Sequence, residues 1–221
     1  MLYYIREVRG ATEELKPMAN KIFAFVGPNS SGKATIITQL MSMGIPCIRT
    51  YTTYDFREND PKTKIYTHMS REDFLRQDFI VKVSYKGHYY GILKKDVLWA
   101  LENNGVTVMV LDVNGIKQIN KLIKQNIYTI YLMADYVVLV DRMLRKGLRN
   151  DEIKYHLEYA EANNEFENWK TTNFVIKNTG KINVALEQIL AVMGLMTLPP
   201  QEQFNQIVWG SSKPKQSEEQ Q

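Results

Sequence analysis

Residues 21–43, KIFAFVGPNSSGKATIITQLMSM, place a glycine-rich loop between a strand pattern and a helix pattern. The apolar run Ile22–Val26 predicts a short buried strand that ends at a glycine. Apolar residues then recur at spacings of three and four, at Ile36, Ile37, Leu40 and Met43. This spacing predicts a helix over Lys33–Met43, and Gly44 follows where helices commonly end. The loop between them, Gly27–Lys33, matches the pattern G-x-x-x-x-G-K.

The loop has the chemistry of a phosphate site. Successive backbone N–H groups and the N-terminus of the following helix form a concavity that attracts anions. The two glycines allow the tight turn, and Lys33 can reach the β- and γ-phosphates of ATP. We expect the phosphates to contact Gly27, Asn29, Ser30, Ser31, Gly32, Lys33, Ala34 and Thr35. The alternative is a chance glycine-rich turn, which the spacing and the flanking periodicity disfavour.

The residue after the loop lysine departs from the usual motif. That position normally holds a serine or threonine whose hydroxyl coordinates Mg²⁺, and here it holds Ala34. A methyl group cannot ligate a cation that demands oxygen. Thr35 points about 100° further round the helix and is a poor replacement. Phosphate binding by ATP is therefore better supported than Mg²⁺-dependent transfer, and the use of Mg²⁺ stays open.

Composition limits the classes of partner. The chain has 221 residues, enough for one α/β domain or a tight pair, and a formal net charge of +4. This mild excess of positive charge suits anionic substrates but is too weak to predict nucleic-acid binding. A single cysteine, Cys47, allows no internal disulfide. The three histidines, His68, His88 and His156, lack metal-ligand spacing, so we expect no metal site.

No membrane segment is expected either. The longest apolar stretches, such as Val106–Leu111, are far shorter than the about 20 residues that span a bilayer. The first residues, Met1–Gly10, lack the apolar core of a signal peptide. We therefore expect a cytoplasmic protein.

Strand-like and helix-like segments alternate along most of the chain. The pattern predicts further strands at Ile45–Thr50, Val106–Asp112, Ile127–Leu132 and Asn173–Lys177. It predicts further helices at Leu93–Glu102, Gly115–Lys124, Asp135–Arg145, Asp151–Trp169 and Ile182–Met193. Such alternation is typical of an α/β protein whose parallel sheet is covered on both faces. Residues Tyr51–Tyr90 are extended and turn-rich around a short helix at Arg71–Gln77, which predicts an inserted, substrate-facing subdomain.

The two ends differ from this body. Residues 1–20 form an N-terminal extension, in which Tyr3, Tyr4 and Ile5 can add an edge strand. Residues 199–221 form a tail rich in Gln, Pro, Ser and Glu, and we expect it to be partly disordered. Its apolar residues can dock on the body or on a partner protein, and the sequence leaves both open: Phe204, Ile207, Val208 and Trp209.

Six stretches, in this order, together resemble the guanylate kinase family. They are KIFAFVGPNSSGKAT, TYTTYDFR, IYTHMSREDF, DFIVKVSYKGHYYG, VMVLDVNG and FVIKN, and they cover roughly residues 21–195. The resemblance implies a P-loop three-layer sandwich with a central parallel sheet, in a domain over residues 21–198. It also implies a nucleotide-monophosphate-binding subdomain at about 51–92 and a helical lid at about 146–156. The implied reaction moves the γ-phosphoryl group of ATP to GMP.

The resemblance also assigns binding residues. It implies contacts to the nucleoside monophosphate from Thr50, Arg57, Tyr66, Tyr90 and Asp112, and a contact on the adenine side from Asn178. Asn114 is an alternative to Asp112, and the two tyrosines can instead be packing residues.

Several family positions have changed. Tyr54 stands where the family has the first of two arginines that hold the GMP phosphate. Val81 and Ile92 stand where it has a glutamate and a serine that read guanine. A site built on hydrogen bonds discriminates poorly once such partners are lost. We therefore predict weak binding of GMP.

In the implied lid, Lys146 and His156 occupy the places of two arginines that reach the transferring phosphates. Lysine keeps the charge but not the planar fork, and we interpret His156 as a solvent-facing helix residue. Arg142, Arg145 and Arg149 lie nearby and either serve the phosphates or are surface charges. The catalytic candidates are Lys33, Arg142 and Lys146.

Two functions follow from these residues. The first is a P-loop nucleoside monophosphate kinase that binds ATP or ADP and has weakened specificity for GMP. The second is a catalytically deficient module of the same fold, which binds nucleotide or phosphate and recognises a partner protein. The intact loop favours the first function. The replacements at Ala34, Tyr54, Val81 and His156 favour the second.

Overall fold

The computed structural model describes residues 20–56, 60–123 and 125–196. Four expectations lie outside these residues: the edge strand at Tyr3–Ile5, the phosphate contact of Arg57, the partial disorder of the C-terminal tail, and the docking of its apolar residues.

A parallel sheet forms the centre of the molecule. Its strands are β1 (Lys21–Val26), β6 (Val106–Val110), β7 (Ile127–Met133) and β8 (Phe174–Lys177), in the order β6-β1-β7-β8. All three pairings are parallel. The inner strand β1 is buried along Ile22–Val26, as expected for a strand covered on both faces. Its carboxyl end leads directly into the loop at residues 27–32, the predicted phosphate-binding loop.

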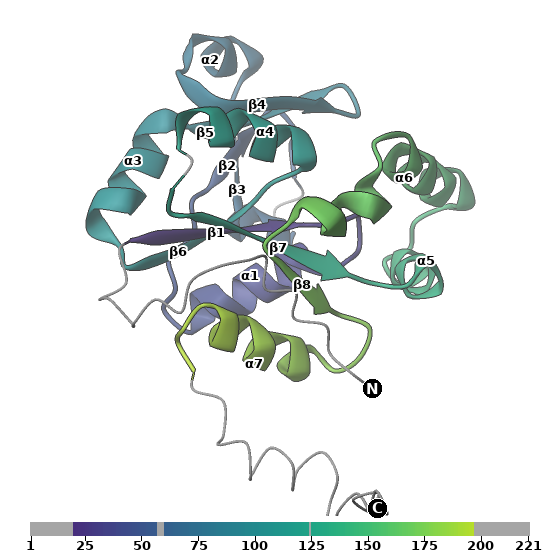
Figure 1. The fold of residues 1–221 in the computed structure, drawn as a ribbon. Helices are drawn as coiled ribbons and strands as arrows, with labels where there is room; N and C mark the ends of the chain where they lie inside the picture. The colour runs from purple at the N-terminus through teal and green to yellow at the C-terminus, as the bar shows by residue number, and fades with distance from the viewer. Residues whose placement is uncertain (1–19, 57–59, 124, 197–221) are drawn as a thin grey trace, which may run out of the picture.

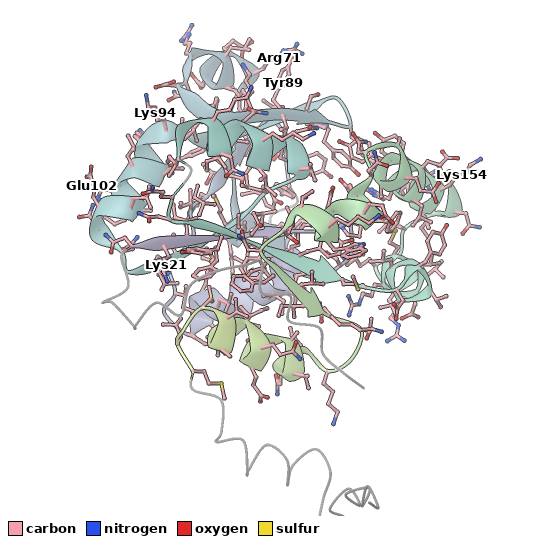
Figure 2. All side chains as sticks on the ribbon, in the orientation of Figure 1. Lys21, Arg71, Tyr89, Lys94, Glu102 and Lys154 are labelled. Carbon is pink, nitrogen blue, oxygen red and sulfur yellow. The ribbon has the colours of Figure 1, made fainter. Side chains whose placement is uncertain are left out.

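A second, mixed sheet packs above the first (Figure 1). Its strands are β2 (Thr50–Thr52), β3 (Tyr66–His68), β4 (Phe79–Tyr85) and β5 (His88–Leu93), in the order β3-β2-β5-β4. The short helix α2 (Arg71–Arg76) and the 3-10 helix η1 (Pro61–Lys64) belong to the same region. At its outer end, Arg71 donates a hydrogen bond to the hydroxyl of Tyr89 over 3.1 Å, and Figure 2 shows the two side chains together.

Helices cover both faces of the central sheet (Figure 1). On one face, α1 (Lys33–Ser42) and α7 (Ile182–Val192) bury Ile36, Leu40 and Ile189 against the strands. On the other face, α3 (Lys94–Asn103), α4 (Val113–Leu122) and the second sheet form another apolar core. Helices α5 (Tyr136–Arg145) and α6 (Asn150–Ala162) pack on each other to one side, and the 3-10 helix η2 (Glu165–Thr171) leads to β8.

Two sequence predictions need correction. The segment 45–50 is not a strand of the central sheet. It makes a single bridge from Cys47 to Val108, and only Thr50 belongs to β2 in the second sheet. Pro46 has no N–H group with which to extend the ladder. The predicted helix Asp151–Trp169 is also broken: α6 ends at Ala162, and Asn164 takes a left-handed conformation with φ of 52° before η2 begins.

In the part of the chain that the structure describes, none of the helices combines the length and the apolar character needed to cross a membrane. The architecture is that of an α/β protein with a parallel central sheet and a second mixed sheet, so the predicted fold class is confirmed.

Candidate functional site

The phosphate-binding loop has a backbone that only glycine fits at two points. Gly27 has φ of +141° and Gly32 has φ of +106°. A Cβ atom on Gly27 would lie 2.8 Å from the carbonyl oxygen of Leu132, and a Cβ atom on Gly32 would overlap the side-chain amide of Asn178. Another side chain at either position would therefore strain the loop and push its neighbours apart.

Lys33 is folded onto this loop. Its Nζ donates hydrogen bonds to the carbonyl oxygens of Gly27 at 2.5 Å and Pro28 at 2.9 Å. Burial lowers the pKa of Lys33 to about 8, although the negative charge of Glu165 acts in the opposite direction. The ammonium group is thus held at the mouth of the loop, where it can meet an anion.

Two predicted residues brace the loop from behind. The guanidinium of Arg142, on α5, donates to the carbonyl oxygens of Ser30 at 3.3 Å, Ser31 at 3.2 Å and Asn178 at 2.8 Å. The side-chain amide of Asn178 donates to the carbonyl oxygen of Ser31 at 2.8 Å. Neither residue lines the cavity in front of the loop. The catalytic role of Arg142 and the adenine contact of Asn178 stay predictions, and both side chains position the loop.

A cavity of about 440 Å³ extends from the loop to the second sheet, a volume typical of small-molecule sites. It brings together these predicted site residues: Gly27, Asn29, Ser30, Gly32, Lys33, Ala34, Thr35, Thr50, Tyr66, Tyr90, Asp112 and Lys146. Ser31 is fully buried behind the loop, with its hydroxyl lacking a hydrogen-bond partner among the described residues.

The loop fits phosphate, and its fit to Mg²⁺ is incomplete. Ala34 places a half-buried methyl group where an oxygen ligand is usual, while Thr35 is exposed and lines the cavity. No group of three or more His, Cys, Asp or Glu side chains gathers into a metal site within the described ranges.

Aromatic rings line the part of the cavity away from the loop. Tyr54 meets Phe56 edge-on at 4.8 Å between ring centroids, Phe56 lies 5.4 Å from Tyr66, and Tyr66 lies 6.1 Å from Tyr90. Burial raises the pKa of Tyr66 and of Tyr90, so both hydroxyls stay protonated and can donate hydrogen bonds. Tyr54 therefore makes an aromatic contact at the position where the family resemblance implies a positively charged arginine.

Val81 and Ile92 form a wall of the same cavity, with exposed fractions of 3% and 1%. Nearby, Asp112 begins α4 and accepts a hydrogen bond from the backbone N–H of Gly115 at 2.6 Å. Burial raises the pKa of Asp112, while hydrogen bonds from the backbone and the charge of Lys33 act in the opposite direction. This end of the cavity is therefore apolar, with one carboxyl group at its edge.

Lys146 lies at the C-terminal end of α5. Its Nζ donates to the hydroxyl of Ser30 at 3.1 Å. Burial lowers its pKa, as do the positive charges of Lys62 and Arg142. Lys146 thus faces the same loop as Lys33.

The interpretation of His156 as a solvent-facing residue was wrong. Its exposed fraction is 8%, whereas Lys154, on the same helix, projects outward (Figure 2). Nδ1 of His156 lies 2.8 Å from Nδ2 of Asn29 and 2.5 Å from the hydroxyl of Tyr85, and Nε2 lies 3.2 Å from Nζ of Lys86. Burial, followed by the charges of Lys86 and Lys62, lowers its pKa to about 4. His156 is therefore neutral at pH 7 and joins α6 to the loop and the second sheet.

The sequence contained a signal for this burial. Ile153, His156, Leu157 and Ala160 are the buried residues of α6, at spacings of three, four and seven from Ile153. Such spacing places the histidine on the apolar face of the helix rather than on its solvent face.

Several cavity residues escaped the sequence prediction, among them Lys62 and Glu165. Lys62 lies on η1, and its positive charge lowers the pKa of Lys33, Lys146 and His156. Glu165 begins η2, lines the cavity, and has a pKa raised by burial. No motif marks Lys62. The pair Asn163–Asn164, which tolerates a break in a helix, was the available signal for the turn that brings Glu165 inward.

Comparison with known proteins assigns this chain to a family. A family model described as guanylate kinase matches residues 19–194, most of the chain. The chain belongs to the guanylate kinase family. A guanylate kinase from Clostridium tetani is 26% identical over 172 residues, which cover 76% of this chain and 82% of that protein. One from Sus scrofa is 27% identical over 133 residues, covering 57% of this chain and 67% of that protein.

The fold agrees with a solved member of the guanylate kinase family. The crystal structure of guanylate kinase from Anaplasma phagocytophilum aligns with a TM-score of 0.59 at 18% identity, over 90% of this chain and 100% of that chain. The family assignment implies nucleotide binding and the use of ATP. The changes at Ala34, Tyr54 and Val81 concern which nucleotide and which chemistry, so they bear on function within the family.

Proposed function

We propose that this chain binds ATP or ADP at Gly27–Lys33 and transfers the γ-phosphoryl group of ATP to a nucleoside monophosphate, with weakened specificity for GMP. The observation that carries this proposal is the single cavity that joins Lys33 to Tyr66 and Tyr90. A donor phosphate at the loop and an acceptor phosphate near the tyrosines would then share one cavity.

In this reaction the bond from the γ-phosphorus to the β,γ-bridging oxygen breaks, and a bond to an acceptor phosphate oxygen forms. The products are ADP and a nucleoside diphosphate. The loop N–H groups and Lys33 hold the donor phosphates, and Lys146 adds positive charge beside Ser30. Arg142 keeps the loop in shape from behind. Mg²⁺, when bound, neutralises phosphate charge, and this chain offers it no hydroxyl at Ala34.

Weakened specificity for GMP rests on the wall of the cavity. A carboxylate accepts hydrogen bonds from guanine N1–H and N2–H₂, and the buried side chain of Val81 accepts none. Isoleucine at position 92 likewise offers no hydroxyl. Guanine would leave polar groups unpaired at this wall.

A second function has support of its own. His156 stands at the place of a family arginine and is neutral, so it cannot stabilise negative charge as phosphate transfers. This favours a nucleotide-binding module that contacts a partner protein, for which residues 1–20 and 199–221 are available. In either role we propose action in the cytoplasm.

Calorimetry with ADP tests the binding common to both functions. Lys33→Ala should weaken ADP binding at least tenfold, because the terminal phosphate loses its counter-charge. The control Lys95→Ala, an exposed residue of α3 outside the cavity, should leave the affinity unchanged. Equal affinity of wild type and Lys33→Ala would refute phosphate binding at the loop.

A coupled assay of ATP consumption separates the two functions. GMP, AMP, dTMP and CMP are each offered to the wild type as acceptor. Transfer to any of them that Lys33→Ala abolishes supports the kinase. ADP binding without transfer to any acceptor supports the interaction module.

A further inference from the structure

Two sides of the cavity meet where the β4–β5 hairpin touches α6 (Figure 1). The second sheet supplies one side, with Val81, Tyr85 and Tyr90, and the loop and α6 supply the other, with Gly32 and His156. At its base, the second sheet shares an apolar core with α3 and α4. At the hairpin tip, polar and aromatic contacts join the two sides instead. The tip is therefore the place where the two sides can separate without breaking the apolar core.

The contacts at the tip converge on one ring. Nδ1 of His156 lies 2.5 Å from the hydroxyl of Tyr85 and 2.8 Å from Nδ2 of Asn29, and both of these groups are donors. The lone pair of the neutral ring is therefore at Nδ1 and its hydrogen is at Nε2, which lies 3.2 Å from Nζ of Lys86. The ring of Tyr85 also stacks on that of His156 at 6.1 Å between centroids. We call these four residues, His156, Tyr85, Asn29 and Lys86, the His156 junction.

A second proton on the ring would break the His156 junction. The proton would occupy Nδ1, which could then no longer accept a hydrogen bond from Tyr85 or Asn29. It would also place a positive charge beside the ammonium group of Lys86.

The surroundings of the ring oppose that charge. The charged and titratable groups that face it are Lys86 and Tyr85 of the hairpin, Lys62 of η1, Lys146 at the end of α5, and Glu152 and Tyr155 of α6. The lysines outnumber the single carboxylate. Burial, together with this excess of positive charge, lowers the pKa of His156 to about 4. Separation of the two sides would expose the ring to water and remove both effects, so the open arrangement binds the proton more readily.

We propose that the His156 junction is a latch that holds the second sheet against α6, slows the entry and exit of nucleotide at Gly27–Lys33, and opens when His156 is protonated. The inference rests on the proposed function, because it requires nucleotide at the loop. A latch that forms in both the free and the loaded protein restrains entry and exit alike. Loosening the latch therefore raises both rate constants and leaves their ratio, the dissociation constant, nearly unchanged.

Stopped-flow fluorescence on the full chain measures both rate constants, with ADP that carries an N-methylanthraniloyl group on its ribose. Tyr85→Phe keeps the ring and removes the hydroxyl that contacts Nδ1 of His156. Loss of this hydrogen bond should raise the association and dissociation rate constants about fivefold each, with the dissociation constant within about twofold of wild type.

Tyr155→Phe is the matched control. It makes the same chemical change on a ring that meets His156 edge-on, at 6.0 Å between centroids. Both of its rate constants should stay within about twofold of wild type. Wild-type rates in Tyr85→Phe overturn the latch. A weaker affinity with an unchanged association rate overturns it as well, because that result describes a damaged loop and not an opened cavity.

The same measurement at pH 7 and pH 5 tests the release by acid. His156→Gln keeps an acceptor for Tyr85 but does not titrate. The phosphate of ADP and the carboxyl groups of the cavity titrate in both proteins, so the ratio of wild-type to variant rate constants isolates His156. That ratio should rise about tenfold from pH 7 to pH 5, for entry and exit alike. Equal pH responses of the two proteins overturn the release by acid, and this comparison also decides the proposal should Tyr85→Phe not fold.

The failure of this inference differs from the failure of the proposed function. ADP binding that depends on Lys33, with equal rate constants in wild type, Tyr85→Phe and His156→Gln at both pH values, overturns the latch and leaves nucleotide binding at the loop intact. Absence of ADP binding to the wild type overturns both.

Discussion

Ala34, in the first turn of α1, has a methyl group where the P-loop motif usually has a hydroxyl group. The loop before it keeps the glycines and the lysine of the motif. Backbone N–H groups and Lys33 act on phosphate without a metal, whereas the Mg²⁺ contact needs a hydroxyl. We therefore expect ADP binding to depend less on Mg²⁺ than in a P-loop kinase with serine or threonine at this position.

Ala34→Ser tests this expectation, because it restores the hydroxyl. Removing Mg²⁺ with a chelator should weaken ADP binding to the serine variant more than to the wild type, by about tenfold, as measured by calorimetry. Ala34→Gly, which adds no oxygen, is the control. A hundredfold loss in the wild type on chelation would mean that Thr35 or another oxygen already serves the metal.

Lys62 brings a positive charge to the cavity that the sequence analysis did not predict. It lines the cavity, and its positive charge acts on Lys33, Lys146 and His156. Lys64, two residues along the same 3-10 helix, is exposed and does not line the cavity.

Lys62→Ala should therefore weaken binding of ADP or of a nucleoside monophosphate about threefold to tenfold, since an exposed cation contributes modestly to phosphate binding. Lys64→Ala should leave both affinities within twofold of wild type. Calorimetry at low and high salt checks the electrostatic origin, because only the effect at position 62 should shrink as salt rises. Equal effects of the two variants would show that general surface charge is responsible.

Among the elements, α6 carries a junction between the loop and the second sheet. His156 contacts Asn29 of the loop, and also Tyr85 and Lys86 at the tip of the β4–β5 hairpin. Tyr159, one turn further along α6, meets Tyr85 edge-on at 4.7 Å. Helix α6 is thus held to the second sheet by a neutral ring and aromatic contacts.

The pKa of His156 makes this junction sensitive to acid. Its folded value of about 4 lies below the ordinary 6.5, so the unfolded chain takes up the proton first. The stability that the neutral ring contributes is complete above about pH 6.5 and is lost as the pH falls towards 4. Urea unfolding at pH 7 and pH 4.5 should show wild type losing about 1–3 kcal/mol more than His156→Gln.

His68→Gln is the matched control, because His68 is exposed and makes one backbone contact, 3.2 Å from the carbonyl oxygen of Tyr54. It should lose as much stability as the wild type between the two pH values. Identical losses in wild type and His156→Gln would show that His156 titrates in the folded state as a solvated histidine does.

Element prediction succeeded where a periodic pattern was undisturbed. Ile22–Val26 and the apolar face of α1 could be predicted because burial on both faces of a strand and on one face of a helix leaves a direct pattern. The segment 45–50 looked like a strand by composition, and only its position between two sheets decides its pairing. The break at Asn164 depends on the backbone conformation of one residue, which periodicity does not report.

On the scale of the whole molecule, the cavity assembles residues that lie far apart in the chain. The loop, Thr50, Tyr66, Tyr90 and Asp112 could be placed together because the family resemblance supplies their arrangement. Lys62 could not, because no motif marks it and its place depends on a short 3-10 helix. For Glu165 the Asn163–Asn164 pair signalled a turn but not the direction that the chain takes after it. For Arg142, the sequence predicted a place near the loop. It could not predict from which side of the loop the guanidinium group approaches.

The combined changes predict poor GMP phosphorylation. Val81 removes the acceptor for the guanine N–H groups, and Tyr54, 41% exposed at the cavity, replaces one phosphate clamp with an aromatic ring. At about 1.5–3 kcal/mol for each charged hydrogen bond, these two losses together weaken GMP binding a hundredfold or more. His156 then adds no charge to the transition state.

We expect wild type to turn over GMP more slowly than about 1 s⁻¹, the low end for ordinary kinases, in a coupled assay with millimolar GMP. Tyr54→Arg combined with Val81→Glu should restore GMP binding that calorimetry can measure. The single variants are the controls, and each should recover only part of the affinity because they act on different ends of GMP. The new carboxyl group would lie beside Asp112, so its repulsion raises both pKa values and GMP affinity should increase as the pH rises from 6 to 8. Wild-type turnover above 1 s⁻¹ would show that other cavity residues, with Lys62 first among them, replace what positions 54 and 81 have lost.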